Sequence, residues 1–315
     1  MPLPIPTNAV LSLGAALAWG GGDFAGGMGV KRCGSSVRAG LVVVLIGHLL
    51  SLIVVAIMAH HTGNPFPHGA PLWWAIGGGF LAALSLMAFY IALSAGHMGA
   101  AAAISGLLCA AVPALVSALT EGAPGWRRLL GFTLAAIAIW RIASPGPAET
   151  NSDPLLEASE LTSVHESAAE AAAAHKRSSL FAVLGGIGFG VYFVSLKYAA
   201  PAGVLWALGA ARIGSAGTAA LTLLALMLFA HTDMSLTFSK NALAWIVTGA
   251  TLDTAGNLLY IAATQLGRLD VAAVIASLYP ASTIVLAAII LRERTTRRQL
   301  AGMFLALPAV ILITL

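Results

Sequence analysis

Charged residues are scarce in this chain of 315 residues, where Asp, Glu, Lys and Arg together make up 9%. A soluble protein of this length needs a far more charged surface, so the composition excludes an ordinary soluble enzyme or binding domain. Hydrophobic residues make up 59% of the chain, and its mean hydropathy is +0.90. The composition therefore predicts a protein embedded in a membrane.

Cysteine is nearly absent, since only Cys33 and Cys109 occur. They are far apart and lack metal-binding spacing, so a disulfide is possible but unsupported, and we interpret both as small packing residues. The histidines of the "HHTGNPFPH" loop (60–68) have no carboxylate or cysteine beside them to complete a ligand set. We therefore expect no metal and no cofactor.

Signatures of nucleotide binding and of catalysis are also missing. The sequence has no Walker-type phosphate loop, no H-E-x-x-H and no G-x-S-x-G. The net charge of +4 comes from loop lysines and arginines, which bear on membrane orientation and not on nucleic acid. We expect neither an enzyme nor a nucleic-acid-binding protein.

Ten apolar runs are long enough to cross a bilayer, whose core of about 30 Å needs about 20 helical residues. They cover residues 9–29, 37–58, 72–95, 98–120, 127–143, 179–199, 203–230, 242–265, 270–291 and 299–315. The apolar–polar alternation that marks a membrane β-barrel is absent. We predict an all-α integral membrane protein with ten transmembrane helices, and we expect the first run to be a retained span because no basic residue precedes it.

One polar segment, residues 144–178, divides the runs into five and five. It is either a flexible solvated linker or a short surface helix that begins at Asp153–Pro154 and ends near Lys176 and Arg177. The expected divisions are a first repeat (1–143), the linker (144–178) and a second repeat (179–315).

The two halves resemble each other in sequence. Residues 96–142 align without a gap with residues 267–313, and Gly96 with Gly267 is one of the identical pairs. Because each half has an odd number of spans, the second half must enter the membrane from the opposite side. This predicts an inverted repeat, the architecture with which many secondary transporters achieve alternating access.

Particular stretches resemble the drug/metabolite transporter superfamily. The stretch "AWGGGDF" (18–24), followed by Arg38 at the start of the second run, looks like the opening of its five-helix repeats. The stretch "LYPASTIVLAAIILRERTTRRQLAGMFLALPAVILI" (278–313) is similar to the end of its EamA-type domain. The first half departs from the pattern, because Cys109 stands where the second half has Pro280. The resemblance implies transport of small organic solutes.

Lysine and arginine are more numerous in the loops on the side of residues 144–178 than on the side of the two termini. By the positive-inside rule, this places the linker in the cytoplasm and both termini outside. We expect a multi-pass protein of the cell (inner) membrane.

The stretch "ATLDTAGNLLYIA" (250–262) carries a carboxylate in the middle of an apolar run. Burying a carboxylate at a helix centre costs about 2.5–3.5 kcal/mol, so Asp253 is expected to face the bundle interior or a wet cavity. Asn257, Tyr260 and Thr264 follow at helical spacing and share its face. We predict a polar cavity wall. The alternative is a single interhelical hydrogen bond that holds this helix in place.

A second intramembrane carboxylate, Asp23, lies one turn from Trp19 on the same helix face. We expect it to point inward. It is either a proton or substrate-amine site or the partner of a basic residue such as Lys31 or Arg38.

Arg212 lies well inside a predicted span. Its alignment with Arg38 favours a position toward a helix end, where the side chain would snorkel to the interface. The alternative is a counter-ion for Asp253 or for a substrate carboxylate. Tyr192 and Lys197 fit a packing residue and an interfacial anchor better than ligand contacts, although Tyr192 lies mid-span.

In "ASLYPAST" (276–283), Pro280 removes a backbone donor and frees a carbonyl group one turn earlier. Broken helices near the midplane often present such groups to the solute, and Ser277 and Tyr279 could add side-chain contacts. The alternative is a gentle kink that is filled by packing.

These patterns predict a secondary transporter, an exporter of a small organic metabolite that works by alternating access with proton coupling or exchange. In the first half, the positions aligned with Asp253 and Asn257 are the apolar Ala83 and Met87. A cavity with one polar wall and one apolar wall suits an amphipathic, amino-acid-like solute. The candidate cavity residues are Trp19, Asp23, Tyr192, Arg212, Asp253, Asn257, Tyr260, Ser277 and Tyr279.

The alternatives are a polytopic membrane enzyme and a lipid flippase. The expected partners are the lipid bilayer, the solute and protons. The oligomeric state is left open between monomer and homodimer.

Overall fold

The computed structural model describes residues 6–34, 36–94, 98–143, 164–229, 238–292 and 295–315. All regular structure within these ranges is helical, which confirms the all-α fold class. The elements are α1 (Thr7–Arg32), α2 (Val37–His61), α3 (Ala70–Ser94), α4 (Met98–Thr120), α5 (Trp126–Ala143), α6 (Val164–Ala199), η1 (Ala200–Ala202), α7 (Val204–Phe229), α8 (Lys240–Leu266), α9 (Leu269–Ala276), α10 (Tyr279–Ile290) and α11 (Arg297–Thr314).

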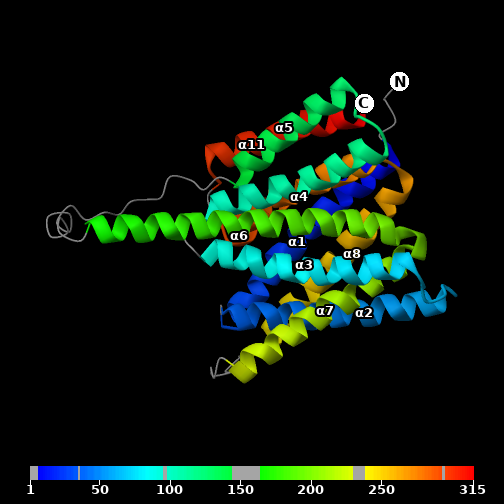
Figure 1. Ribbon diagram of the computed structural model, residues 1–315, viewed down its shortest axis with the longest axis horizontal. Helices are drawn as coiled ribbons and strands as arrows, with labels where there is room; N and C mark the ends of the chain where they lie inside the picture. Colours follow the sequence, from blue (N-terminus) through cyan, green and yellow to red (C-terminus); the bar gives the residue numbers. More distant parts are fainter. Residues whose placement is uncertain (1–5, 35, 95–97, 144–163, 230–237, 293–294) are drawn as a thin grey trace.

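The helices lie side by side along one common direction, so the bundle has two ends (Figure 1). Both chain termini lie at one end, which we call the termini end, and α6 enters from the opposite end, which we call the linker end. The first half therefore starts at the termini end and the second half at the linker end. This is the inverted arrangement that an odd number of spans per half requires.

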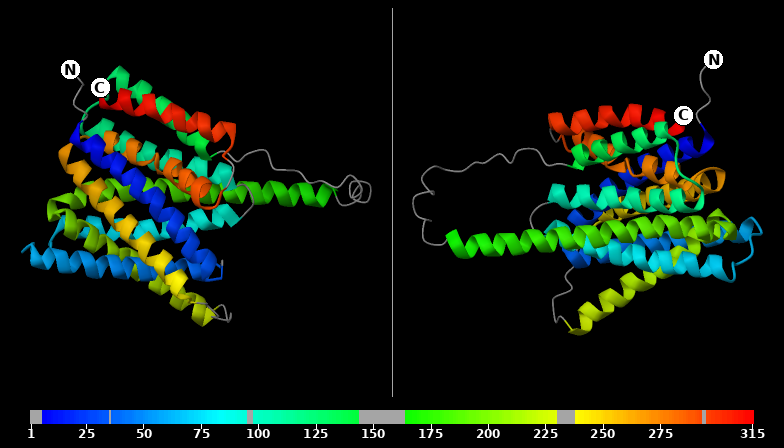
Figure 2. Two further views of the ribbon diagram at one scale, coloured as in Figure 1. Left: turned by 180° about the vertical axis from the view of Figure 1, so that it is seen from behind. Right: turned by 45° about the horizontal axis from the view of Figure 1, so that its top comes forward.

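The first helix of each half packs on the third helix of the other half. α1 packs along α8, and its counterpart α6 packs along α3. α5 pairs with α11, and these two helices lie together at one side of the bundle in Figures 1 and 2. The left view of Figure 2 shows α1 and α8 crossing the bundle side by side. α1 and α8 carry polar residues of the predicted cavity, Asp23 on α1 and Asp253 on α8, and the two helices pack together.

Six segments of the described chain are long and apolar enough to span a membrane, and a shorter apolar helix covers Ile104–Thr120. The six are Arg38–His61, Ala70–Phe89, Ser179–Ala202, Val204–Phe229, Leu269–Ile290 and Arg297–Thr314. α1 and α8 are as long as these segments, but they are less hydrophobic and are not among the six. Polar residues such as Asn8 and Asp23 on α1 and Asp253 and Asn257 on α8 lower the hydropathy of these two helices, which pack along each other.

The helix predicted within the linker is wrong in its extent. α6 runs without interruption from Val164 to Ala199, so no surface helix ends near Lys176. Figure 1 shows that this first part of α6 extends well beyond the bundle. The predicted helix start at Asp153–Pro154 lies outside the described residues. The Ala-rich sequence before the span favours helix, so the span continues into the aqueous region.

The predicted bend in the ninth span is a full break between α9 and α10. Pro280 lies in the first turn of α10, where its missing N–H is tolerated. The carbonyl group of Ala276 therefore has no α-helical donor. The Ser277 N–H instead closes the last turn of α9 on the carbonyl of Ala273, at 2.9 Å.

Candidate functional site

An ion pair joins two helices of the second half in the middle of the bundle. The Arg212 guanidinium on α7 contacts the Asp253 carboxylate on α8, and its Nε also donates to Ser51 Oγ on α2 at 3.2 Å. Arg212 is 3% exposed. The snorkelling expected for Arg212 is therefore wrong, and the counter-ion alternative describes its position. A snorkelling side chain would leave the bundle, whereas three helices surround this one.

The two members of the pair differ in exposure. The Asp253 side chain is 36% exposed, while the Arg212 side chain is 4% exposed. Thr254 Oγ1 donates to Ser51 Oγ at 2.8 Å, which fixes the hydroxyl that supports the guanidinium. A buried guanidinium needs such partners, because an uncompensated buried charge is strongly destabilising. The buried Arg212 guanidinium thus positions the Asp253 carboxylate, which is the more exposed member of the pair.

The polar stripe of α8 forms a connected chain of hydrogen bonds. Asn257 Nδ2 donates to Asp253 Oδ1 at 3.1 Å, and the Tyr192 hydroxyl on α6 donates to Asn257 Oδ1 at 2.8 Å. Tyr192 was expected to pack, but its hydroxyl is part of this chain. The arrangement connects α7, α8 and α6, so it exceeds the single interhelical bond that was the alternative for α8.

An aromatic layer lies next to this chain, on its termini side. Trp19 stacks on Phe193 with ring centroids 5.0 Å apart and an interplanar angle of 12°. Tyr260 lies 4.6 Å from Phe193 and 5.5 Å from Trp19, measured between ring centroids. All three side chains are buried. We call Trp19, Phe193 and Tyr260 the aromatic layer. The aromatic layer fills the interior of the bundle on the termini side of Asp253.

Two glycines let α1 approach α8 at this level. A Cβ atom added to Gly256 would lie 2.6 Å from the Trp19 indole, and one added to Gly22 would lie 3.1 Å from the backbone nitrogen of Asp253. Each is closer than a normal carbon contact. The indole therefore occupies space that only glycine leaves free.

The linker side of the pair is open. Asp23, Gly27 and Lys31 lie one turn apart on α1, and all three are exposed. Asp23 lies near enough to Asp253 for the two carboxylates to interact electrostatically. Because a carboxylate that faced lipid would be costly, we expect this exposed stripe to face a water-filled recess. No ion pair between Asp23 and Lys31 or Arg38 occurs among the described residues.

The predicted residues of the broken helix are divided. Ser277 is fully buried, and its hydroxyl donates to the carbonyl of Ala273 at 2.8 Å and lies against the Cys109 thiol. It therefore does not line the recess. Tyr279 is half-buried and near enough to Asp23 for electrostatic interaction. Its place is consistent with a cavity wall.

A second charged cluster, which was not predicted from the sequence, lies at the termini end. Lys197 on α6 contacts Glu121, just after α4, and was expected only as an interfacial anchor. Arg268, between α8 and α9, donates to the fully buried Asp270 at 2.8 Å. Hydrogen bonding to Asp270 raises the pKa of the Arg268 guanidinium, so it stays charged. Glu121 is more than 70 residues from both Lys197 and Arg268 in the sequence. Analysis of local sequence patterns therefore could not find these contacts between the two halves.

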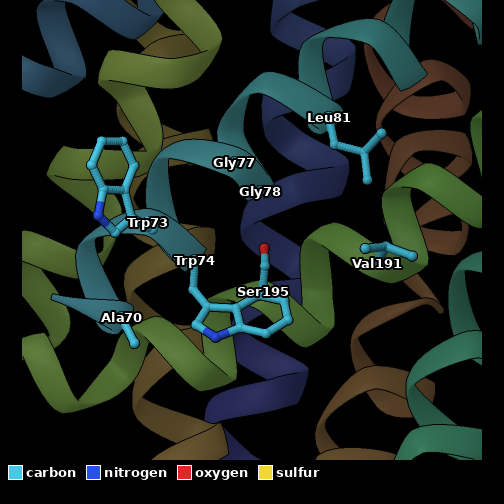
Figure 3. Close-up of a pocket in the computed structure, with 8 residues that line it drawn as sticks. All are labelled: Ala70, Trp73, Trp74, Gly77, Gly78, Leu81, Val191 and Ser195. Atoms are coloured by element: carbon cyan, nitrogen blue, oxygen red, sulfur yellow. The ribbon is translucent and has the colours of Figure 1, made fainter.

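A groove of about 480 Å³ runs between α3 and α6, away from the ion pair (Figure 3). Its walls are Ala70, Trp73, Trp74, Gly77, Gly78, Leu81, Val191 and Ser195. The Ser195 hydroxyl donates to the carbonyl of Tyr192 at 2.7 Å, and the Trp73 indole is 69% exposed. The groove is apolar and offers no charged group, so it does not compete with the site at Asp253.

The profile of the EamA-like transporter family matches residues 176–315. This stretch is an EamA domain. EamA domains belong to the drug/metabolite transporter superfamily, so the resemblance inferred from the sequence is confirmed for residues 176–315. No curated protein matches the chain closely. A solved crystal structure of another protein superposes with a TM-score of 0.73 at 16% identity over 99% of both chains, which shows a shared fold alone.

Proposed function

We propose that this EamA protein is a secondary transporter that exports a small organic metabolite carrying a protonated amine. The observation that supports this proposal is the Arg212–Asp253 pair, in which the guanidinium is buried and the carboxylate is accessible. Asp23 adds a second exposed carboxylate nearby. The three groups carry one more negative than positive charge when all are ionised. A cationic amine would be attracted to Asp253 and Asp23, which repel a carboxylate, whereas the exposed Lys31 lies two turns beyond Asp23 toward the linker end.

The aromatic layer supports an amphipathic solute. Trp19 lies one turn from Asp23 on α1, and aromatic side chains attract cations as well as apolar groups. The positions of α3 that align with the polar stripe, Ala83 and Met87, are apolar. An amino-acid-like amine with an apolar body suits both features.

The direction follows from orientation and accessibility taken together. We place the linker end in the cytoplasm, where the positive loops lie. The recess at Asp253 is open to that end, so the solute would bind from the cytoplasm. Rocking of the two inverted halves would then expose it at the termini end. Asp23 would take up a proton when the amine leaves, which gives proton exchange.

A lipid flippase is less well supported. It would need polar groups along a path that opens to the bilayer, so that a lipid head group could cross. The groove between α3 and α6 has Ser195 as its polar side chain, and that hydroxyl is already bonded within α6. We therefore prefer a transporter of a small organic metabolite to a lipid flippase.

Asp253→Asn tests the proposal. A thermal-shift screen of purified wild-type protein against amines, carboxylates and neutral metabolites identifies ligands, and flux of the best ligand is then measured in proteoliposomes. We expect amines to be selected and Asp253→Asn to lose at least about tenfold in affinity, because a desolvated charge pair is worth more than about 1.4 kcal/mol.

Thr251→Val is the matched control for Asp253→Asn. Thr251 lies two residues earlier on α8 and is exposed on another face, so flux should stay at the wild-type rate. Wild-type flux by the correctly inserted Asp253→Asn variant would contradict the assignment of the site. Selection of anions over amines would contradict the proposed solute class.

A further inference from the structure

The charged cluster at the termini end joins the two halves of the protein. Glu121 follows α4 of the first half, while Lys197, Arg268 and Asp270 belong to the second half. The cluster is separated from the solute site by the aromatic layer, and the proposed binding of the solute does not use it. We call these four residues the termini cluster.

The contacts within the termini cluster are numerous and directional. Glu121 Oε1 contacts the Lys197 ammonium group, while Oε2 accepts from the Leu269 N–H at 3.1 Å and from Ser117 Oγ at 2.7 Å. The Arg268 guanidinium donates to the carbonyl of Glu121 at 3.0 Å and to that of Gly122 at 2.7 Å. The end of α4 is thus tied to both α6 and the start of α9.

Asp270 fixes the arginine that makes these ties. Its carboxylate is fully buried, accepts from Arg268 Nε at 3.1 Å and from the N–H of Val271 at 2.8 Å. Removing one partner of such a pair leaves a buried charge uncompensated. The cluster is therefore held as a unit, and separation of the halves at this end must break its contacts between α4, α6 and α9.

The fold itself does not require this cluster. Under the alignment of the two halves, Glu121 corresponds to Arg292, and Arg268 and Asp270 correspond to His97 and Gly99. The sequence therefore places no acidic residue at these positions of the linker end. An inverted repeat of this kind can be built without the cluster, so its presence at one end calls for a reason specific to that end.

We propose that the termini cluster is the gate that keeps the termini end shut while the recess is open to the linker end. This inference rests on alternating access as proposed above. The gate opens when the contacts of Glu121 with Lys197, Arg268 and Leu269 are exchanged for water. Weakening the gate should shift the protein toward the state that is open at the termini end.

A cysteine reporter tests the gate without any solute. Thr264 lies on α8 between Tyr260 of the aromatic layer and Arg268, and it is 5% exposed. In a background without the two natural cysteines, Thr264→Cys is labelled in sided proteoliposomes by a membrane-impermeant maleimide added at the termini side. Adding Glu121→Gln should raise the labelling rate at least about tenfold.

Lys197→Met is the second gate variant, in case Glu121→Gln does not fold. It leaves the backbone ties of Arg268 intact, so a smaller rise, by about threefold, is expected. Arg127→Gln is the matched control, because Arg127 is an exposed cation at the same end that stacks on Trp126 and touches none of the cluster. Its labelling rate should equal that of the reporter alone.

Equal labelling rates in the reporter, Glu121→Gln and Lys197→Met would show that the termini cluster does not control access from the termini end, and would contradict the proposed gate. This failure is distinguishable from failure of the proposed function. The reporter measures accessibility alone, whereas the function is judged by ligand selection and by flux of Asp253→Asn. A gate response with unchanged Asp253→Asn flux would leave the gate standing and reject the solute site.

Discussion

The two ends of the bundle are built differently although the two halves share one pattern of helix packing. At the linker end, Asp23, Gly27 and Lys31 form an exposed stripe that leads to the ion pair. At the termini end lie the buried aromatic layer and the termini cluster, in which Asp270 is buried and Glu121, Lys197 and Arg268 are partly buried. The helices are therefore related by inversion, while the side chains that close the ends are not.

This difference shows where symmetry is kept and where it is lost. Packing of α1 on α8 and of α3 on α6 depends on small residues that occur in both halves, such as Gly256 beside Trp19 and Gly78 beside Ser195. Charged side chains are expensive inside a membrane and are placed where a specific task needs them. A transporter with one preferred resting state needs different stabilities at its two ends.

Arg212→Met should have the largest effect, because it removes the buried cation that pairs with Asp253 at the inner end of the recess. The Asp253 carboxylate would lose its counter-ion. We expect a cost of about 2–3 kcal/mol, below the 3–5 kcal/mol typical of a fully buried pair, because this carboxylate is 36% exposed. This cost is a loss of folding stability, measured by thermal unfolding in detergent, and flux should also fall because Asp253 loses the group that positions it.

Arg38→Met is the matched control for Arg212→Met, because Arg38 is the aligned arginine of the first half and lies in the first turn of α2. Its flux should stay within about threefold of wild type. Arg212→Lys sharpens the test. A lysine lacks the planar fork that reaches both Asp253 and Ser51, so it should not restore flux. Normal flux in Arg212→Lys would instead support a merely interfacial cation.

Gly256→Ala should have a smaller effect, confined to the closed side. The added methyl group would lie 2.6 Å from the Trp19 indole, so the aromatic layer must shift at a cost of about 1–3 kcal/mol. Thermal unfolding in detergent measures this cost. Gly217→Ala on α7 is the control, since its Cβ meets nothing within 4 Å. It should be neutral or stabilising, by up to about 1 kcal/mol. Equal melting temperatures for the two variants would mean that the layer is not tightly packed.

The sequence was sufficient to predict the helical fold and much of the candidate site. Spacing alone put Asp253, Asn257 and Tyr260 on one face, because helical periodicity is a local property. The cost of a carboxylate in lipid then indicated that this face points inward. The break before Pro280 was also predictable, because proline lacks the backbone donor that a continuous helix needs.

Partners that are distant in sequence were not predictable. The position of Arg212 was misjudged because its alignment with Arg38 gives depth along the helix but not the direction of the side chain. Glu121 and Asp270 lie beside helix ends, where charge is normal, so nothing local distinguished them from solvated residues. The linker helix was misjudged because helix propensity does not mark where a helix leaves the membrane.

The most direct test of the account is the sided accessibility of two single cysteines in the unliganded protein, Gly27→Cys at the open end and Thr264→Cys at the closed end. A cysteine at Gly27 fits without strain, because an added Cβ meets nothing within 4 Å. We predict that an impermeant maleimide labels Gly27→Cys from the linker side at least about tenfold faster than it labels Thr264→Cys from the termini side. Equal rates, or faster labelling of Thr264→Cys, would contradict a recess that is open at one end and shut at the other.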